Sequence, residues 1–302
     1  MEPKIDNMTS SGINNGHEFI DLGLSVKWAT CNVGASTPEG HGDYYAWGEK
    51  ESKNTYNWST YKWSKGSHKR LTKYNTMNYY GLVDNKTTLE HEDDIAHIKW
   101  GNNWRMPTKA EIDELIHYCT WTWTSVNGIN GYRVTSNIEG YTNRAIFLPA
   151  SGFFYDTELK NNGSWGLYLS STLGKSDTDQ AWHIAFISNC IINSEDSEGL
   201  GRSLGGSVRP VFPSNEWSAH ATISLDNDHL ILKSKIDYRL YARVMYKGKE
   251  YDYSNDGFIW TSDNQAVAIV NQKGDVTPVS NGIARITVSL GLLTAKCVIT
   301  VI

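Results

Sequence analysis

Tryptophan is distributed very unevenly along this chain. Eleven of its twelve tryptophans lie before residue 218, and Trp260 alone follows. Indole rings serve either as large core side chains or as flat faces that contact a ligand. The C-terminal part instead alternates apolar and polar residues between regularly spaced turns, which is typical of short β-strands. The sequence therefore predicts two domains of different kinds.

The length of 302 residues suits one large domain followed by a small one. We expect a polar N-terminal segment over residues 1–17 and a first domain over residues 18–214. A short hinge over residues 215–219 precedes a second domain over residues 220–302.

Residues 108–119 carry the clearest helix signal. Thr108 is a candidate N-cap, and Glu111 completes a capping box three residues later. The apolar residues that follow recur at helical spacing and form one stripe. They are Ile112, Leu115, Ile116 and Cys119.

Short strands are expected after this helix, and polar loops with one short helix are expected over residues 50–100. The strand candidates are Gly131–Val134, Ala145–Leu148, Trp165–Ser171, Gln180–Ile187 and Ser207–Phe212. One helix among many short strands favours a compact α+β domain.

The second domain resembles the group 2 bacterial immunoglobulin-like domain. The phrases that carry the resemblance are Ile259–Val270, Lys273–Val279, Gly282–Val288 and Ala295–Val301. The resemblance covers about the last 80 residues. It implies a β-sandwich that spaces or presents another domain and has no active site. Trp260 suits the core of such a sandwich.

The first domain resembles the Fibrobacter succinogenes major paralogous domain, a family common in Bacteroidetes. The phrases that carry this resemblance are Asp21–Val33, Gly42–Glu49, Trp104–Leu115, Leu148–Phe153, Leu169–Thr172 and Val208–Val211. The resemblance implies a fold related to C-type lectins and formylglycine-generating enzymes, with a ligand surface on loops. The expected fold class is thus an α+β C-type-lectin-like domain plus an all-β immunoglobulin-like sandwich.

Charge and hydropathy argue against a nucleic-acid partner and against insertion into a membrane. The net charge is −5, and neither part has the basic excess that binding to nucleic acid requires. No stretch approaches the ~18 apolar residues of a membrane span. Residues 1–16 are polar and contain no apolar leader segment. We therefore expect neither a nucleic-acid partner nor insertion into a membrane. The protein would reach the outside by one of three routes: export without a visible leader, export followed by removal of a leader, or release as part of a phage particle.

The four cysteines form no metal-binding or redox spacing. Cys119 and Cys297 lie in apolar patterns and are expected to be buried. A disulfide between Cys31 and Cys190 remains open. Formylglycine-generating enzymes use two nearby cysteines, whereas Cys190 stands alone in its region, which argues against such catalysis.

Two acidic clusters are candidate cation sites. The run from His91 to His97 (HEDDIAH) could hold a metal, but it lacks the zincin spacing and is better interpreted as a solvated loop or helix start. The second cluster offers oxygen ligands of the type that Ca²⁺ prefers. Its members are Asp177, Asp179, Glu195, Asp196 and Glu198. Because the sequence phrases of Ca²⁺-dependent lectins are missing, we expect no cofactor, with Ca²⁺ as the alternative.

The first domain has more aromatic residues than a core of about 200 residues can bury. Trp28, Trp47 and Trp104 are expected in the core, which leaves rings for ligand contact. The predicted binding residues lie on late loops and strands. They are Tyr155, Trp165, Asp177, Asp179, Trp182 and Asn189. The alternative place for the site is Trp58–Trp63.

No catalytic constellation is visible, since the serine elbow motif is absent and Ser170 and Ser171 suit strand ends. The sequence favours a non-catalytic recognition or adhesion protein that binds a glycan or a surface protein on a bacterial cell surface. The alternatives are a structural subunit of a phage particle that contacts other virion subunits and, more weakly, a modifying enzyme or hydrolase.

Overall fold

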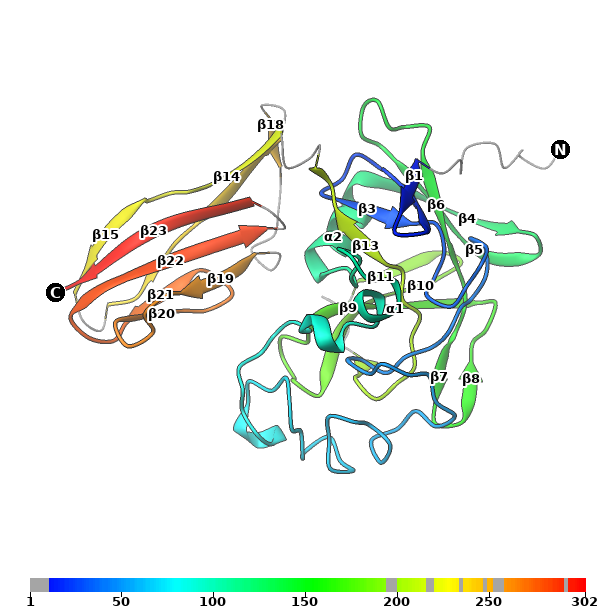
Figure 1. Cartoon of the computed structure of the whole chain (residues 1–302), viewed down its shortest axis with the longest axis horizontal. Helices are drawn as coiled ribbons and strands as arrows, with labels where there is room; N and C mark the ends of the chain where they lie inside the picture. Colours follow the sequence, from blue (N-terminus) through cyan, green and yellow to red (C-terminus); the bar gives the residue numbers. More distant parts are fainter. Residues whose placement is uncertain are drawn as a thin grey trace. The chain divides into compact units, whose positions relative to one another are not determined.

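The computed structural model describes residues 11–193, 200–215, 220–233, 236–246, 249–251, 258–290 and 293–302. The chain forms two compact units, residues 1–212 and 213–302 (Figure 1). The expected hinge lies for the most part outside the described residues, as do the three acidic residues Glu195, Asp196 and Glu198.

The first unit contains several small sheets and two α-helices among its described residues. One antiparallel sheet has the order β1 (Gly12–Asn14), β2 (His17–Ile20), β3 (Val26–Ala29) and β13 (Val211–Pro213). A second has the order β4 (Cys119–Val126), β5 (Ile129–Ser136) and β6 (Ala145–Pro149). The strands β7 (Phe153–Tyr155) and β8 (Glu158–Lys160) form a separate hairpin.

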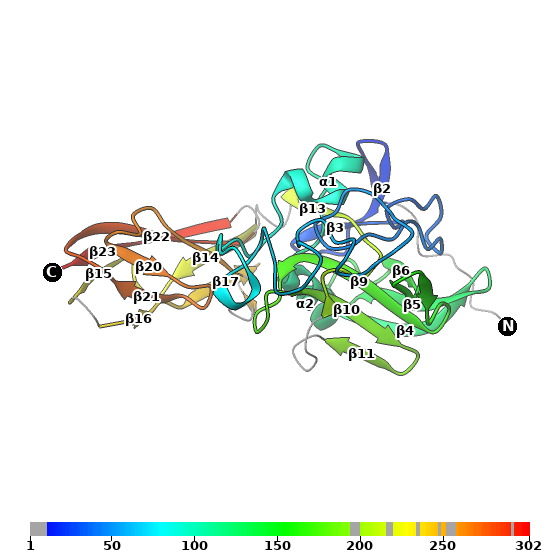
Figure 2. The ribbon, with the colours of Figure 1, turned by 90° about the horizontal axis from the view of Figure 1, so that it is seen from below.

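The strand β10 (Gln180–Ile187) lies at the centre of the remaining sheet. It pairs on one side with β9 (Trp165–Leu173), and on the other with β11 (Cys190–Asn193) and β12 (Leu200–Gly201). Figure 2 shows β9, β10 and β11 side by side.

The helices and 3₁₀ turns are short. They are η1 (Asn78–Tyr80), η2 (His91–Asp93), α1 (Ile95–Trp100) and α2 (Lys109–Tyr118). The α2 prediction is confirmed. Thr108 caps the helix, and its side chain and that of Glu111 form both bonds of the capping box.

The expected α+β C-type-lectin-like fold is wrong. Strands make up 45% of the chain and helices only 9%, so the structure is nearly all β with many small sheets. The ten residues of α2 gave a strong sequence signal, but one helix of this length cannot form a layer over the sheets. The core is held together instead by aromatic rings and buried hydrogen-bonding side chains.

The tryptophans expected in the core are there. Trp28, Trp47 and Trp104 are each at most 2% exposed, and they belong to two extended clusters of buried apolar residues. Buried arginines tie irregular segments to this core. Arg209, for example, donates to the carbonyl oxygens of Ala29 and Thr30.

The long segment before α1 is mostly irregular, as expected. Figures 1 and 2 show it as a blue-to-cyan trace that runs along one side of the first unit. It carries several aromatic residues that pack against each other. Tyr56 and Tyr61 are buried in a small cluster with Leu71, and Trp58 packs on that cluster half-buried.

The second unit is built of strands among its described residues. One sheet has the order β14 (Ala221–Leu225), β17 (Ala242–Tyr246) and β18 (Lys249–Tyr251). A second has the order β15 (His229–Leu232), β23 (Leu293–Val301), β22 (Gly282–Leu290) and β19 (Ile259–Ser262). A third has the order β16 (Tyr238–Arg239), β21 (Asp275–Pro278) and β20 (Ala268–Val270). Trp260 is 2% exposed, as expected of a core ring.

All four cysteines have free thiols, which answers the question that the sequence left open for Cys31 and Cys190. Cys119 and Cys297 are buried, as expected. Burial raises the pKa of the Cys119 thiol to about 12 and that of Cys297 to about 11.

Candidate functional site

A row of aromatic rings lies beside two carboxylates on the surface of the first unit. Its members are Trp58, His68, Tyr79, Tyr80, Asp177 and Asp179, and we refer to them as the aromatic–acidic surface. The four rings come from the irregular segment, whereas the two acids come from the loop between β9 and β10. Segments almost 100 residues apart thus contribute to one surface.

The rings follow each other in close contact. The centroids of Trp58 and His68 are 6.0 Å apart, and those of His68 and Tyr80 are 6.4 Å apart. Tyr79 meets Tyr80 edge to face at 5.0 Å. Tyr79 is 62% exposed, and the ammonium of Lys69 lies 4.7 Å from its ring centroid. The chain's own Lys69 ammonium thus lies within cation–π distance of the exposed Tyr79 ring.

The carboxylates differ in their surroundings. The hydroxyl of Tyr80 donates to Oδ1 of Asp177 at 2.5 Å, and this bond is the main reason why the pKa of Tyr80 is raised. Burial raises the pKa of Asp179. Its Oδ1 is buried and has no hydrogen-bond partner among the described residues. Within this part of the chain, Oδ1 of Asp179 is thus an acceptor atom that is enclosed by protein and has no donor.

Arg202 holds the segments of this surface together. It is 1% exposed, and its Nε donates to the hydroxyl of Tyr61 at 2.9 Å. Its Nη1 donates to the carbonyl oxygens of Tyr74 and Thr178, both at 2.8 Å. The backbone N–H of Arg202 also donates to the carbonyl oxygen of Asp179. One buried side chain thus fixes the ring-bearing segment against the acid-bearing loop.

The structure does not bring the six predicted binding residues together. Asp177 and Asp179 lie at one end of the β9–β10 hairpin, and Trp165 pairs with Ile187 at the other end. Asn189 is exposed in the turn that follows Ile187.

The remaining two predicted residues are Trp182 and Tyr155. Trp182 is the third residue of β10, three positions after Asp179, and the ammonium of Lys109 lies 4.7 Å from its ring centroid. Tyr155 is 58% exposed at the end of β7. His68, Tyr79 and Tyr80 were not among the predicted binding residues, although Tyr79 and Tyr80 belong to the excess of aromatic residues and Trp58 falls within the alternative segment Trp58–Trp63.

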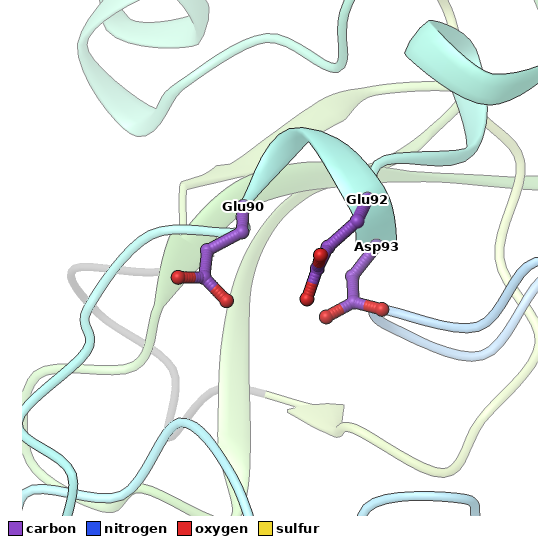
Figure 3. Close-up of side chains that lie close together, drawn as sticks. All are labelled: Glu90, Glu92 and Asp93. Carbon is purple, nitrogen blue, oxygen red and sulfur yellow. The ribbon is translucent and has the colours of Figure 1, made fainter.

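Glu90, Glu92 and Asp93 form the other acidic cluster, and Figure 3 shows their carboxylates side by side. Each carboxylate binds Lys73, whose Nζ lies 2.5 Å from Glu90, 3.2 Å from Glu92 and 2.6 Å from Asp93. The hydroxyl of Tyr74 also donates to Asp93.

The ammonium of Lys73 stands where a metal ion would have to bind. It lowers the pKa of Glu90, and the carboxylates raise the pKa of Lys73 despite its partial burial. The neighbouring residues of the HEDDIAH run have structural partners. Asp94 caps α1, and Nδ1 of His97 bonds with the carbonyl oxygen of Trp104. This cluster is best explained as a salt-bridge network.

Comparison with known families identifies one part of the chain. The bacterial Ig-like domain family matches residues 258–302, which contain β19 to β23 of the second unit. The immunoglobulin-like part of the expected fold is therefore confirmed. The finer assignment to group 2 and the resemblance of the first unit to the Fibrobacter succinogenes family stay predictions.

No curated protein matches this sequence. Among solved structures, the crystal structure of domains 4 and 5 of the S-layer protein SbsC is 11% identical to this chain. The match covers 61% of this chain and 99% of that chain, with a TM-score of 0.25. A TM-score this low establishes no common fold. Among the described residues, no helix has the length and apolarity needed to cross a membrane.

Proposed function

We propose that this chain is a non-catalytic recognition protein of a bacterial surface. Its aromatic–acidic surface binds a carbohydrate, and its immunoglobulin-like unit spaces or presents that surface. The observation that carries the proposal is the exposed ring of Tyr79, which contacts Tyr80, whose hydroxyl donates in turn to the carboxylate of Asp177.

The chemistry of this surface suits a sugar. A pyranose presents C–H groups on one face, which pack on aromatic rings, and hydroxyl groups at its rim, which donate to carboxylates. Tyr79 offers the exposed ring, and the partly exposed Asp177, which already accepts from Tyr80, offers a carboxylate close to it. Tyr80 links the exposed ring to this carboxylate, which supports a sugar-binding contact that uses both.

Preorganisation supports the same proposal. The rings and the acids are fixed by Arg202 and by the bond from Thr178 Oγ1 to Asn75 Oδ1, which is 2.6 Å long and buried. A site whose side chains are already ordered loses less conformational entropy when it binds. This favours recognition by a stable surface.

The hydroxyls that an acyl-transfer enzyme would need are engaged in structure. Ser170 donates to the carbonyl oxygen of Trp182 at 2.8 Å, and Ser171 donates to that of Pro107. Both are buried. Neither of these two hydroxyls is placed to act as a nucleophile, which supports a non-catalytic role.

A glycan array probed with the full chain tests the proposal. We expect binding to one glycan class, and we expect Tyr79→Ala to weaken it by about tenfold or more, since stacking on one ring contributes roughly 1–2 kcal/mol. Tyr155→Ala is the matched control, because that ring is similarly exposed on a different element. Loss of binding with Tyr155→Ala alone would place the site at β7.

Further measurements separate a metal-free sugar site from a Ca²⁺-dependent site, from a protein ligand and from a virion subunit. Binding that disappears with EDTA would assign Ca²⁺ to the acids of the β9–β10 loop, whereas unchanged binding supports a metal-free surface. Absence of binding across a broad array would overturn the carbohydrate proposal in favour of a protein ligand. A virion subunit would instead co-purify with particle proteins from infected cells.

A further inference from the structure

The strand β4 has a free edge. In the sheet β4–β5–β6 it pairs with β5 alone, over all eight residues from Cys119 to Val126. Across residues 11–193 and the other described ranges, no further backbone hydrogen bond reaches Thr120–Ser125. The side chains of Thr120, Thr122 and Ser125 are exposed.

This edge lacks the features that protect sheet edges in monomeric proteins. Charged residues, proline and bulges commonly block pairing with another strand. The segment from 119 to 126 (CTWTWTSV) contains no charged residue and no proline, and its register with β5 is continuous. An unprotected edge of eight residues is a template for a further strand.

The direction of the free backbone groups follows from the register. The β4–β5 hairpin closes on the two-residue turn Asn127-Gly128, whose φ angles of 49° and 82° are those of a type I′ turn. The carbonyl oxygen of Tyr118 accepts from the N–H of Asn137 across the same ladder. Because the direction alternates along a strand, even-numbered residues bond to β5. Trp121, Trp123 and Ser125 direct their backbone groups outward.

The sequence of this edge is symmetric about Thr122. Residues 120–124 read Thr-Trp-Thr-Trp-Thr in both directions. In an antiparallel pair of two copies with the two-fold axis at Thr122, Thr120 lies opposite Thr124 and Trp121 lies opposite Trp123. Threonine pairs and aromatic pairs are favourable across strands, and no like charges meet directly.

We propose that β4 of this chain pairs with β4 of a second copy and forms a symmetric dimer with one continuous six-stranded sheet. The outward backbone groups of Trp121 and Trp123 exchange hydrogen bonds across the axis. The exposed threonines form a row on one face of the sheet, while the indoles stay against Tyr132 and Phe186. This interface is independent of the aromatic–acidic surface.

Sedimentation or light scattering of the full chain between about 1 and 200 μM tests the dimer. We expect the mass to rise from 34.0 kDa toward twice that value. Thr122→Lys places two ammonium groups opposite each other on the axis and adds repulsion from Arg133, which pairs with Thr122 on β5. We expect at least tenfold weaker dimerisation. A mass of 34.0 kDa for the unmodified chain throughout this range would overturn the proposal.

Charge complementation separates a broken interface from a misfolded chain. Thr122→Glu alone weakens the dimer less than Thr122→Lys does, because Arg133 beside it on β5 offsets part of the repulsion. An equimolar mixture of the two variants restores the dimer, because Lys then faces Glu on the axis. Thr294→Lys is the control, since Thr294 is exposed on β23 of the second unit, where it pairs with Ser289 of β22. Dimerisation of Thr122→Lys equal to that of the unmodified chain, or a mixture that stays monomeric, would contradict β4 pairing.

Discussion

The guanidinium of Arg202 lies over the indole of Trp47, with Cζ 4.8 Å from the ring centroid. The hydrogen bonds of this guanidinium go to neutral oxygens, three of them backbone carbonyls. A buried cation of this kind joins loops that have no regular ladder of their own, because it offers five donors in a rigid plane. The aromatic–acidic surface therefore depends on a residue that does not lie on it.

Replacement of Arg202 by Met should destabilise the first unit. The change removes the donors and leaves the carbonyl oxygens of Lys73, Tyr74 and Thr178 buried without them. We expect a loss of about 3 kcal/mol in the free energy of unfolding, measured by urea titration. Arg70→Met, at an exposed position, is the control and should change stability by less than about 0.5 kcal/mol.

Replacement of Gly81 by Ala should disrupt the segment that carries Tyr79 and Tyr80. Gly81 has a φ of 132°, and a methyl group there would lie 2.4 Å from the carbonyl oxygen of Leu71. We expect a loss of about 2–4 kcal/mol and weaker ligand binding. Gly66→Ala tests the backbone effect alone, since Gly66 has a φ of 77° but open space around it. It should cost about 1 kcal/mol.

Local features of the fold could be predicted from the sequence. The capping box indicates the start of α2 at Thr108, and the short, mostly apolar run Gln180–Ile187 indicates β10. These signals depend on neighbours in sequence. The fold class could not be predicted in the same way, because it depends on how many small sheets pack together and on what covers them.

The candidate site shows the same limit. Asp177 and Asp179 were identified from their chemistry, but the partner rings lie about 100 residues earlier. Tyr79 and Tyr80 stand in the short 3₁₀ turn η1, within a segment that has no apolar periodicity, so no local pattern indicates that they meet the β9–β10 loop. Arg202, which joins the two segments, carries no motif at all. Only the three-dimensional arrangement combines them.

Of the two residues of the α2 capping box, Glu111 should contribute more to the free energy of unfolding than Thr108. Thr108→Ala removes one cap bond and should cost about 1 kcal/mol. Glu111→Ala removes the other cap bond and also leaves the guanidinium of Arg105 without its carboxylate partner. We expect a loss of about 3 kcal/mol for this second variant, measured by thermal or urea unfolding. Equal losses for the two variants would show that Arg105 contributes little.

Stability should fall between neutral and mildly acidic pH. His183 is 4% exposed, and burial lowers its pKa below the value of 6.5 that it has in the unfolded chain. As pH falls below 6.5, the unfolded chain binds a proton before the native one, so the free energy of unfolding decreases by up to about 1.4 kcal/mol per pH unit. His183→Gln should reduce this decrease, measured by urea unfolding at about pH 7.5 and about pH 5.5. His17 and His41, whose pKa values burial also lowers, should retain part of it.

Removal of Lys73 should convert a salt-bridge network into a cation site. In Lys73→Ala the carboxylates of Glu90, Glu92 and Asp93 remain with oxygen atoms within 4.8 Å of one another, and Asp93 is 2% exposed. Without the ammonium their repulsion should cost about 3 kcal/mol. Because Ca²⁺ takes several carboxylate oxygens, it should bind this variant and recover part of the loss.

Thermal unfolding with and without about 5 mM CaCl₂ measures this exchange. The melting temperature of Lys73→Ala should rise with Ca²⁺, while that of the unmodified chain should stay constant because Lys73 already occupies the position. Lys86→Ala is the matched control, since Lys86 binds Glu90 from the exposed side and leaves the ammonium of Lys73 in place. A Ca²⁺ response in the unmodified chain that equals the response of Lys73→Ala would contradict this prediction, because it would mean that Lys73 does not compete with a cation for these carboxylates.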